Sequence, residues 1–238
     1  MRKGIFLYCN MKIIVTIFLF FISFNLFAQN TSTADIHIGL NQSYRFIDDG
    51  GSETENVRND LEIPKLNFHI GVNFNRLITS QLYVKSGLRF VSMGYKTEKR
   101  DLIFPTGDFT TIQFVYNYLF LEIPLGLRYE FVENTVFIPY IEAGFAPTIY
   151  ATNTVARVQD GDERIYERIP SMRDFSTFHL SANVAAGVNY NTSTETTLFF
   201  QLNYKRHLTN LIEGDFKERL TAYGIEFGLR RSISKVRV

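Results

Sequence analysis

Apolar and polar residues alternate in this chain over stretches longer than the strands of most soluble proteins. The clearest case is residues 65–75, where apolar side chains occupy every second position. Because successive side chains of a β-strand point to opposite faces, this period separates an apolar face from a polar one. The apolar residues are Leu66, Phe68, Ile70, Val72 and Phe74. We therefore predict an amphipathic strand.

The same alternation recurs along the rest of the chain, whereas helical spacing is hard to find. The predicted strands span residues 35–46, 65–75, 81–93, 112–129, 136–149, 177–190, 196–207 and 221–231. Short connections alternate with long polar ones, which lie near residues 47–64, 94–111, 150–176 and 208–220. This arrangement is typical of outer-membrane barrels with long extracellular loops. We expect an all-β fold, an eight-stranded antiparallel up-and-down transmembrane β-barrel.

The glycines indicate which face of each strand points inward. Eight of them lie on polar faces of the predicted strands: Gly39, Gly71, Gly87, Gly126, Gly144, Gly187, Gly224 and Gly228. The interior of an eight-stranded barrel is only wide enough for side chains to fill, so small inward residues relieve crowding. We expect the polar faces to line the interior and the apolar faces to contact lipid. Strand bulges are another explanation for these glycines, and a secreted lipid-binding barrel would have the opposite orientation.

Charged residues on the polar faces must pair, because an unpaired charge in a narrow lumen has a desolvation cost of several kcal/mol. We predict a salt-bridged interior with a surplus of basic groups. Its predicted members are Arg45, Lys85, Arg89, Glu122, Arg128, Glu142, Lys205, Glu226 and Arg230. This network favours structural filling of a closed barrel. A small gated or anion-favouring pore is the alternative, although water-filled channels belong to barrels of roughly 16 strands.

Catalytic patterns are weak. The histidines His37, His69, His179 and His207 lie on four different predicted strands, all on inner faces. His179 shares its face with Ser181, as in a lipid-modifying hydrolase, but the strand rise separates them by about 7 Å and no G-x-S-x-G motif is present. We expect no enzyme activity, no catalytic or metal site and no cofactor. A lipid-modifying outer-membrane enzyme is the alternative.

The N-terminus predicts export. Residues 13–27 are mostly apolar, follow a lysine and precede a small residue, which is the order found in secretory signal peptides. We expect residues 1–28 to be a signal peptide, with Met11 as an alternative start, and residues 29–238 to be the barrel domain. A membrane anchor is the less favoured interpretation. The single cysteine, Cys9, lies in the removed part, which excludes disulfides and thiolate sites from the mature protein.

The net charge and the closed barrel limit the kinds of partner that we expect. Lys and Arg number 25 against 24 Asp and Glu, which excludes a nucleic-acid binder driven by bulk positive charge. We expect contacts with outer-membrane lipid and the barrel-insertion machinery. A closed barrel satisfies its backbone hydrogen bonds within one chain, so we expect a monomer. The long charged loops, including residues 47–60 and 157–174, are where an extracellular or envelope partner would bind.

The chain contains the segments LFLEIPLGLRY at 119–129, PYIEAGF at 139–145 and YKRHLTN at 204–210. These segments resemble the PorT-like outer-membrane β-barrel family of Bacteroidota. The resemblance covers essentially the whole mature chain and is most specific around Glu122 and Pro124, while His207 stands where the family usually has glycine. It implies the barrel fold and the outer membrane of a Gram-negative bacterium, but no reaction. The founding member is associated with assembly of the type IX secretion apparatus, so a role in secretion or envelope assembly is a hypothesis.

Overall fold

A computed structural model describes residues 32–48, 60–103, 105, 109–131, 136–159, 163–167, 176–212 and 217–233. The predicted signal peptide and the alternative start at Met11 lie outside these ranges. Within them the chain forms β1 (Ser32–Asp48), β2 (Glu62–Leu77), β3 (Leu82–Thr97), β4 (Arg100–Ile103), β5 (Phe109–Glu122), β6 (Leu125–Glu130), β7 (Phe137–Gln159), β8 (Glu163–Glu167), β9 (Phe178–Asn191), β10 (Thr196–His207) and β11 (Lys217–Ser232). No helix in the described part of the chain is long and apolar enough to cross a bilayer.

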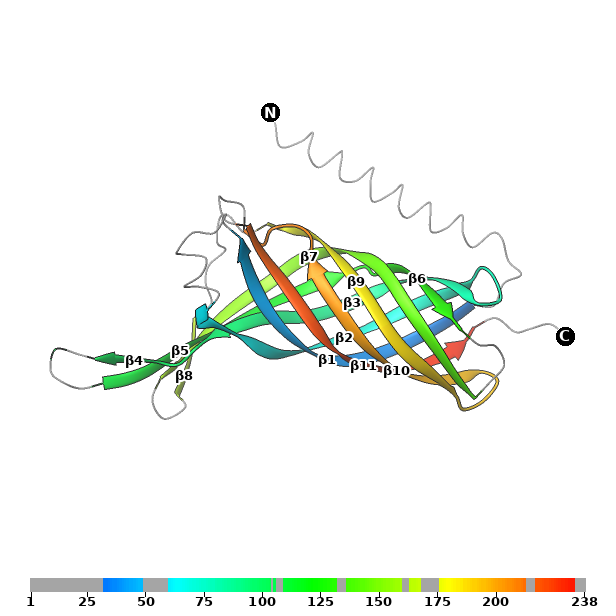
Figure 1. The fold of residues 1–238 in the computed structure, drawn as a ribbon, viewed down its shortest axis with the longest axis horizontal. Coiled ribbons are helices and arrows are strands. Elements are labelled where there is room, and N and C mark those ends of the chain that lie inside the picture. The colour runs from blue at the N-terminus through cyan, green and yellow to red at the C-terminus, as the bar shows by residue number, and fades with distance from the viewer. Residues whose placement is uncertain are drawn as a thin grey trace, which may run out of the picture.

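Hydrogen-bonded pairing closes the sheet on itself (Figure 1). β1 pairs with β2 on one side and with the last strand, β11, on the other. β2 also pairs with β3, and β3 pairs with both β5 and β6. β5 and β6 both pair with β7, β7 pairs with β9, β9 with β10, and β10 with β11. All these pairs are antiparallel. β5 and β6 form one pass, so the described strands make eight passes around the ring. The predicted eight-stranded antiparallel barrel is confirmed.

The break between β5 and β6 lies at Ile123 and Pro124. Proline has no backbone N–H and cannot donate to the ladder, which explains the interruption. The Ile123 N–H still donates to the Pro147 carbonyl on β7 at 2.9 Å. The pass therefore stays in register with both neighbouring strands on either side of the break.

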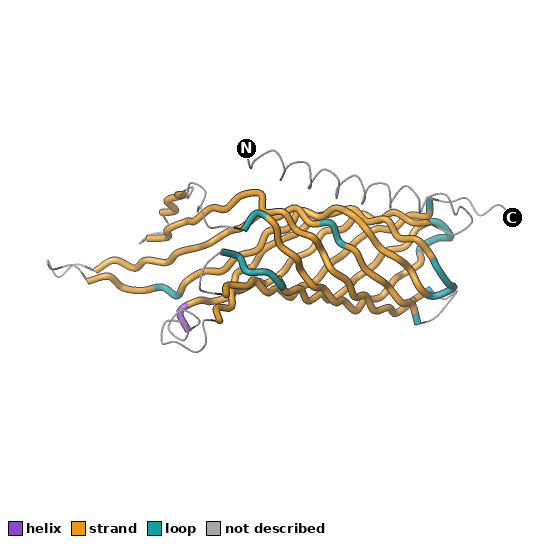
Figure 2. Tube along the Cα trace, turned by 90° about the horizontal axis from the view of Figure 1, so that it is seen from above, coloured by secondary structure: helices purple, strands orange, loops and turns teal. Residues whose placement is uncertain are grey.

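The two ends of the barrel differ. We call the end with the connections after β2, β6 and β9 the turn end, and the end with those after β1, β3, β7 and β10 the loop end. At the loop end β4 pairs with β5, β5 with β7, and β7 with β8, which extends the sheet beyond the barrel (Figure 2). Our expectation of long polar connections between strands over 94–111 and 150–176 is therefore wrong for part of each segment. The charged residues in these segments hide the strand pattern in the sequence, and pairing with neighbouring strands extends the strands into them.

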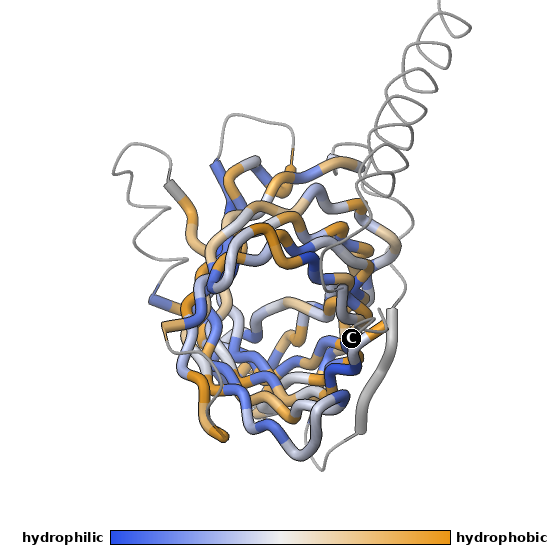
Figure 3. The backbone as a smooth tube through the Cα atoms, turned by 90° about the vertical axis from the view of Figure 1, so that its right-hand side faces the viewer, coloured by the Kyte–Doolittle hydropathy of each residue, from blue (hydrophilic) through white to orange (hydrophobic). Residues whose placement is uncertain are grey.

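Exposure follows the predicted faces, with apolar residues outside and polar ones inside. Leu66 is 68% exposed, whereas its neighbour Asn67 is 4% exposed. In Figure 3, which looks along the barrel, hydrophilic and hydrophobic positions alternate along the strands. The glycines lie close to interior groups: a Cβ at Gly71 would come within 2.7 Å of the Leu88 carbonyl oxygen and 2.8 Å of His37 Nε2. The exposed apolar band is what a lipid-embedded barrel requires.

Candidate functional site

The barrel interior holds three layers along its axis. A pocket lies at the turn end, an ion-pair network fills the middle, and an apolar cluster fills the loop end. We call these the turn-end pocket, the central network and the apolar plug. Most of their residues occupy the alternate inward positions of the strands, because a strand directs every second side chain to the same face.

The central network contains buried pairs between strands far apart in sequence. Lys85 Nζ lies 2.7 Å from Glu142 Oε1. Glu226 Oε2 lies 2.9 Å from His69 Nε2 and 3.4 Å from Arg89 Nη2. All five side chains are almost completely buried. The network therefore ties β2, β3, β7 and β11 together across the lumen.

Two further groups of pairs extend this network toward the loop end. Lys205 on β10 pairs with the buried Glu122 at the end of β5. Arg45 lies between two carboxylates, pairing with Glu62 and, at 2.8 Å, with Glu218. The structure thus places these predicted residues in the interior with opposite charges beside them.

The predicted surplus of basic groups is wrong. The sequence analysis placed six basic and three acidic side chains in the interior, but four further carboxylates lie there: Asp35, Glu62, Glu130 and Glu218. The named interior residues therefore include seven acids against six Lys and Arg. Asp35 could have been found, since it shares the face of His37 in a predicted strand. Glu62 and Glu218 were missed because their segments were taken for loops.

The apolar plug was also missed by the sequence analysis. It consists of Val91, Met93, Tyr95, Tyr118, Phe120, Leu211, Leu220 and Ala222, all buried. The signal for it lies in β3, where Val91 and Met93 share the inward face with Arg89. Leu211 comes from the connection after β10 and is fully buried, held by a hydrogen bond from its N–H to the Glu218 carbonyl at 2.7 Å. The interior is therefore not polar throughout.

The two histidines at the plug do not form the hydrolase arrangement considered above. His179 Nδ1 lies 3.3 Å from the Thr209 hydroxyl, and the Ser181 hydroxyl lies 3.3 Å from that of Thr148. All these side chains except Thr209 are fully buried. The ring of His207 lies 5.4 Å from that of His179. These groups pack inside the wall, away from lipid.

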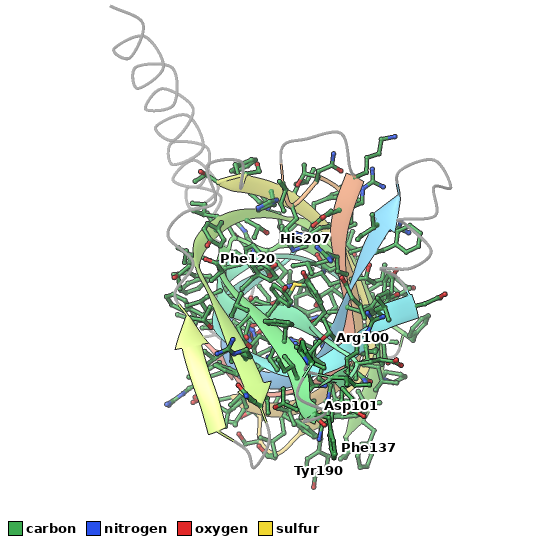
Figure 4. The ribbon with its side chains drawn as sticks, turned by 90° about the vertical axis from the view of Figure 1, so that its left-hand side faces the viewer. Arg100, Asp101, Phe120, Phe137, Tyr190 and His207 are labelled. Carbon is green, nitrogen blue, oxygen red and sulfur yellow. The ribbon has the colours of Figure 1, made fainter. Side chains whose placement is uncertain are left out.

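Aromatic contacts join this histidine pair to the plug. The Phe120 ring makes edge contacts with His207 at 5.1 Å and His179 at 5.7 Å between centroids. Figure 4 labels Phe120 and His207, seen from the loop end. Edge-to-face packing of this kind is favourable for aromatic rings. The pair therefore packs as part of the apolar filling.

The turn-end pocket has a volume of about 150 Å³. Its charged lining residues are Arg128, Glu130 and Arg230, with Asn189 and Tyr83 beside them. Arg128 Nε lies 3.4 Å from Glu130 Oε1, and Arg230 Nη1 lies 3.9 Å from the same oxygen. The last two predicted network members, Arg128 and Arg230, thus belong to the pocket rather than to the central network.

Comparison with known proteins places the chain among outer-membrane barrels. Residues 27–213 match the family model described as "Outer membrane protein beta-barrel domain". Similar solved structures include Neisserial surface protein A, with 13% identity, 85% of this chain and 97% of that chain covered and a TM-score of 0.47. OprG from Pseudomonas aeruginosa (14% identity, TM-score 0.42) and the protease OmpT from Escherichia coli (10%, 0.43) have the same coverages.

No curated protein sequence matches the chain. The family model alone spans most of the predicted mature protein, and its residues include β1 to β10. The chain therefore belongs to the outer membrane protein β-barrel domain family, and it resides in the outer membrane of a Gram-negative bacterium.

Proposed function

We propose that this protein is a closed, non-conducting barrel that acts through its loop end. The observation that carries the proposal is the filled interior. Phe120, Leu211 and Leu220 are fully buried across the loop end, and paired charges such as Lys85 and Glu142 fill the middle. These packed side chains occupy the space that a channel would need, so the packing supports a structural barrel rather than a channel.

The extension at the loop end supports an interaction role. Its strands carry exposed apolar side chains, with Ile103 79% and Phe109 72% exposed. Outer-membrane barrels place their long connections outside the cell, so this end is the extracellular one in our proposal. Functional sites commonly lie on connections held by a rigid scaffold. A partner at the cell surface, with the barrel itself a monomer, fits this arrangement.

The two other functions have less support. A small gated pore needs a continuous path, which the apolar plug and the central network occupy. A lipid-modifying enzyme needs a nucleophile and base that reach lipid and each other. His179 and Ser181 are fully buried and contact Thr209 and Thr148 instead. We therefore propose a non-enzymatic protein without a cofactor.

Conductance tests the first half of the proposal. The mature protein, purified in detergent, is inserted into planar lipid bilayers, with a 16-stranded porin as the positive control. We expect no current steps from this protein under conditions in which the porin conducts. Reproducible steps that scale with the amount of folded protein would favour the pore.

Crosslinking in living cells tests the second half. A photoreactive residue replaces Ile103 at the loop end, and the matched control replaces Ile233, which is 56% exposed at the turn end. We expect a discrete protein adduct from position 103 on intact cells that position 233 does not give. An absence of adducts at 103, with the barrel folded and at the cell surface, would contradict the interaction role.

A finer assignment rests on sequence resemblance. We propose that the chain is a PorT-like member from Bacteroidota, supported by the segment 119–129 around Glu122 and Pro124. A link to type IX secretion then predicts that deletion of the gene lowers the amount of secreted type IX cargo and that the intact gene restores it. Normal cargo levels in the deletion strain would remove this role and leave the barrel proposal in place.

A further inference from the structure

The turn-end pocket is lined by two buried arginines that carry more N–H donors than the described part of the protein provides acceptors for. Arg128 is 1% and Arg230 is 6% exposed, although both line the pocket. The volume, about 150 Å³, is well above the roughly 10–15 Å³ that one water needs. Partly exposed residues, Thr33, Asn191 and Thr197, border the same pocket. They lie at the turn end, where β1 and β10 begin and β9 ends, so the pocket is accessible from that end.

Aromatic rings cover the flat faces of both guanidinium groups. The Arg128 carbon Cζ lies 4.5 Å from the centre of the Tyr83 ring and 5.7 Å from that of Tyr140. The Arg230 Cζ lies 5.0 Å from the centre of the Phe199 ring. A guanidinium that stacks on aromatic rings can use only its N–H edge for hydrogen bonds. The rings therefore fix the direction in which each arginine presents its donors.

Several of those donors have no acceptor among the described residues. Arg128 donates from Nη1 to Asn75 Oδ1 at 3.3 Å, but its Nη2 and Nε have no hydrogen-bond partner. Arg230 donates from Nη1 to Asn189 Oδ1 at 3.0 Å, while its Nε has none. Buried donors without acceptors are unfavourable, so these N–H groups point to a ligand that supplies oxygen atoms.

The nearby carboxylates do not satisfy these donors. Glu130 lies 3.4 Å from Arg128 Nε without hydrogen-bond geometry, and it accepts a hydrogen bond from Asn189 Nδ2 at 2.8 Å. Asp35 Oδ2 lies 3.6 Å from Arg230 Nε, and its two oxygens accept from Asn73 and Asn75 at 2.7 and 2.8 Å. The carboxylates thus lie beside the arginines as ion-pair partners without accepting hydrogen bonds from these nitrogens.

We propose that the turn-end pocket binds a phosphate group. Arg128 on β6 and Arg230 on β11 line the pocket from two strands, and Thr33 and Tyr83 line it as well. A planar carboxylate offers two oxygens in one plane, whereas the tetrahedral phosphate offers oxygens in several directions, which suits donors that come from different walls. The ligand is inorganic phosphate or a small phosphate monoester. This site does not depend on what the loop end binds.

Calorimetric titration of the folded mature protein in a nonionic detergent tests the site. Inorganic phosphate and glycerol 3-phosphate are the two probes for the source of the phosphate group, and acetate is the carboxylate probe. We expect saturable binding of phosphate with one site per chain and weaker binding of acetate. Tighter binding of the monoester or of the free ion then identifies the source.

Variants locate the binding. Arg128→Gln and Arg230→Gln should each weaken phosphate binding by about tenfold or more, because each removes charged donors. Arg231→Gln is the matched control: the neighbouring side chain is 71% exposed and pairs only loosely with Glu195 at 3.7 Å. It changes the net charge equally and should leave binding unchanged. Arg128→Lys keeps the charge but loses the planar fork, so it should also bind more weakly even if Arg128→Gln fails to fold.

Three results would overturn the proposal. One is the absence of saturable heat with both phosphate probes on the folded protein. Another is equal binding by the wild type and the folded pocket variants, which would place the ion elsewhere. The third is acetate binding as tightly as phosphate, which would make the pocket a carboxylate site.

Discussion

The turn-end half and the loop-end half of the barrel fill the same narrow lumen with different chemistry. Toward the turn end and the middle, charged and amide side chains from the strands pair across the interior, as Lys85 does with Glu142. At the loop end, apolar side chains such as Met93 and Phe120 pack against each other. Paired charges need partners in fixed positions, which strands supply, whereas an apolar cluster mainly needs its volume filled.

The source of the filling differs accordingly. The carboxylates and bases of the central network all come from barrel strands. The apolar plug, in contrast, includes Leu211 from a connection outside the strands, and the Ser176 N–H donates to its carbonyl at 3.1 Å. The comparison teaches that the polar half depends on the barrel register, while the apolar half also depends on how a connection folds back.

The largest expected effect comes from breaking the polar half at Glu226. In Glu226→Ala, His69 and Arg89 lose their shared carboxylate while they stay buried. Leaving a buried charge without its partner costs about 3–5 kcal/mol. We expect the free energy of unfolding in detergent, measured by urea titration with circular dichroism, to fall by that amount.

The control for this prediction is Glu195→Ala. Glu195 and Arg231 form an ion pair whose side chains are 67% and 71% exposed. Exposed pairs contribute about 0–1 kcal/mol, so the control should unfold almost as the wild type does. Equal losses from both variants would mean that the buried pairing is not what stabilises the polar half.

The next effect concerns the apolar half. Leu211→Ala removes a fully buried side chain from the plug. A buried Leu→Ala change costs about 2–5 kcal/mol, and a site on a connection, which can relax, should fall near 2–3 kcal/mol. The same urea titration measures it. Leu208→Ala, which truncates a 42% exposed leucine in the same segment, is the matched control and should lose much less.

The sequence predicts one half of the interior better than the other. Period-two alternation is enough to place Arg89, Glu122 and Glu226 inside, because strand geometry fixes the face of every residue. It does not identify partners, which depend on cross-barrel distances. Val91 lies on one of these inward faces, so part of the plug could have been predicted in the same way. Leu211 could not, because it lies in a connection, where no period fixes the direction of a side chain.

Two of the four missed carboxylates have a similar explanation. Glu62 and Glu218 lie at the loop end, in segments that were expected to be loops, and they become inward strand positions only because β2 and β11 extend further. Strand ends are set by pairing with neighbouring strands more than by local composition. The balance of charge in the interior therefore follows from tertiary pairing, which the sequence alone does not show.

A smaller effect tests how tightly the polar half is packed. In Gly71→Ala, the new Cβ would lie 2.7 Å from the Leu88 carbonyl oxygen and 2.8 Å from His37 Nε2. Overpacking of this kind costs about 1–3 kcal/mol. Gly126→Ala meets only one close atom, the Ala143 carbonyl oxygen at 2.9 Å, and the other nearest atoms are at 3.5 Å. Urea titration should show a larger loss for Gly71→Ala, and the reverse order would argue against crowding as the reason for glycine at position 71.

The smallest expected change in stability tests whether the barrel needs buried charges in its polar half or only the volume that they fill. Replacing Lys85 and Glu142 together, as Lys85→Met with Glu142→Leu, removes both members of a buried pair and leaves neither charge alone. Such exchanges are often neutral, so we expect the free energy of unfolding to stay within about 1 kcal/mol of the wild type, while either single change costs about 3–5 kcal/mol. If the double variant is as unstable as the single ones, the pair fixes the positions of β3 and β7 on either side of β6 in a way that apolar volume cannot replace. If the double variant is as stable as expected, apolar side chains can fill the lumen in the polar half as they do in the apolar half. The charged pair in the wild type then has a role other than stability.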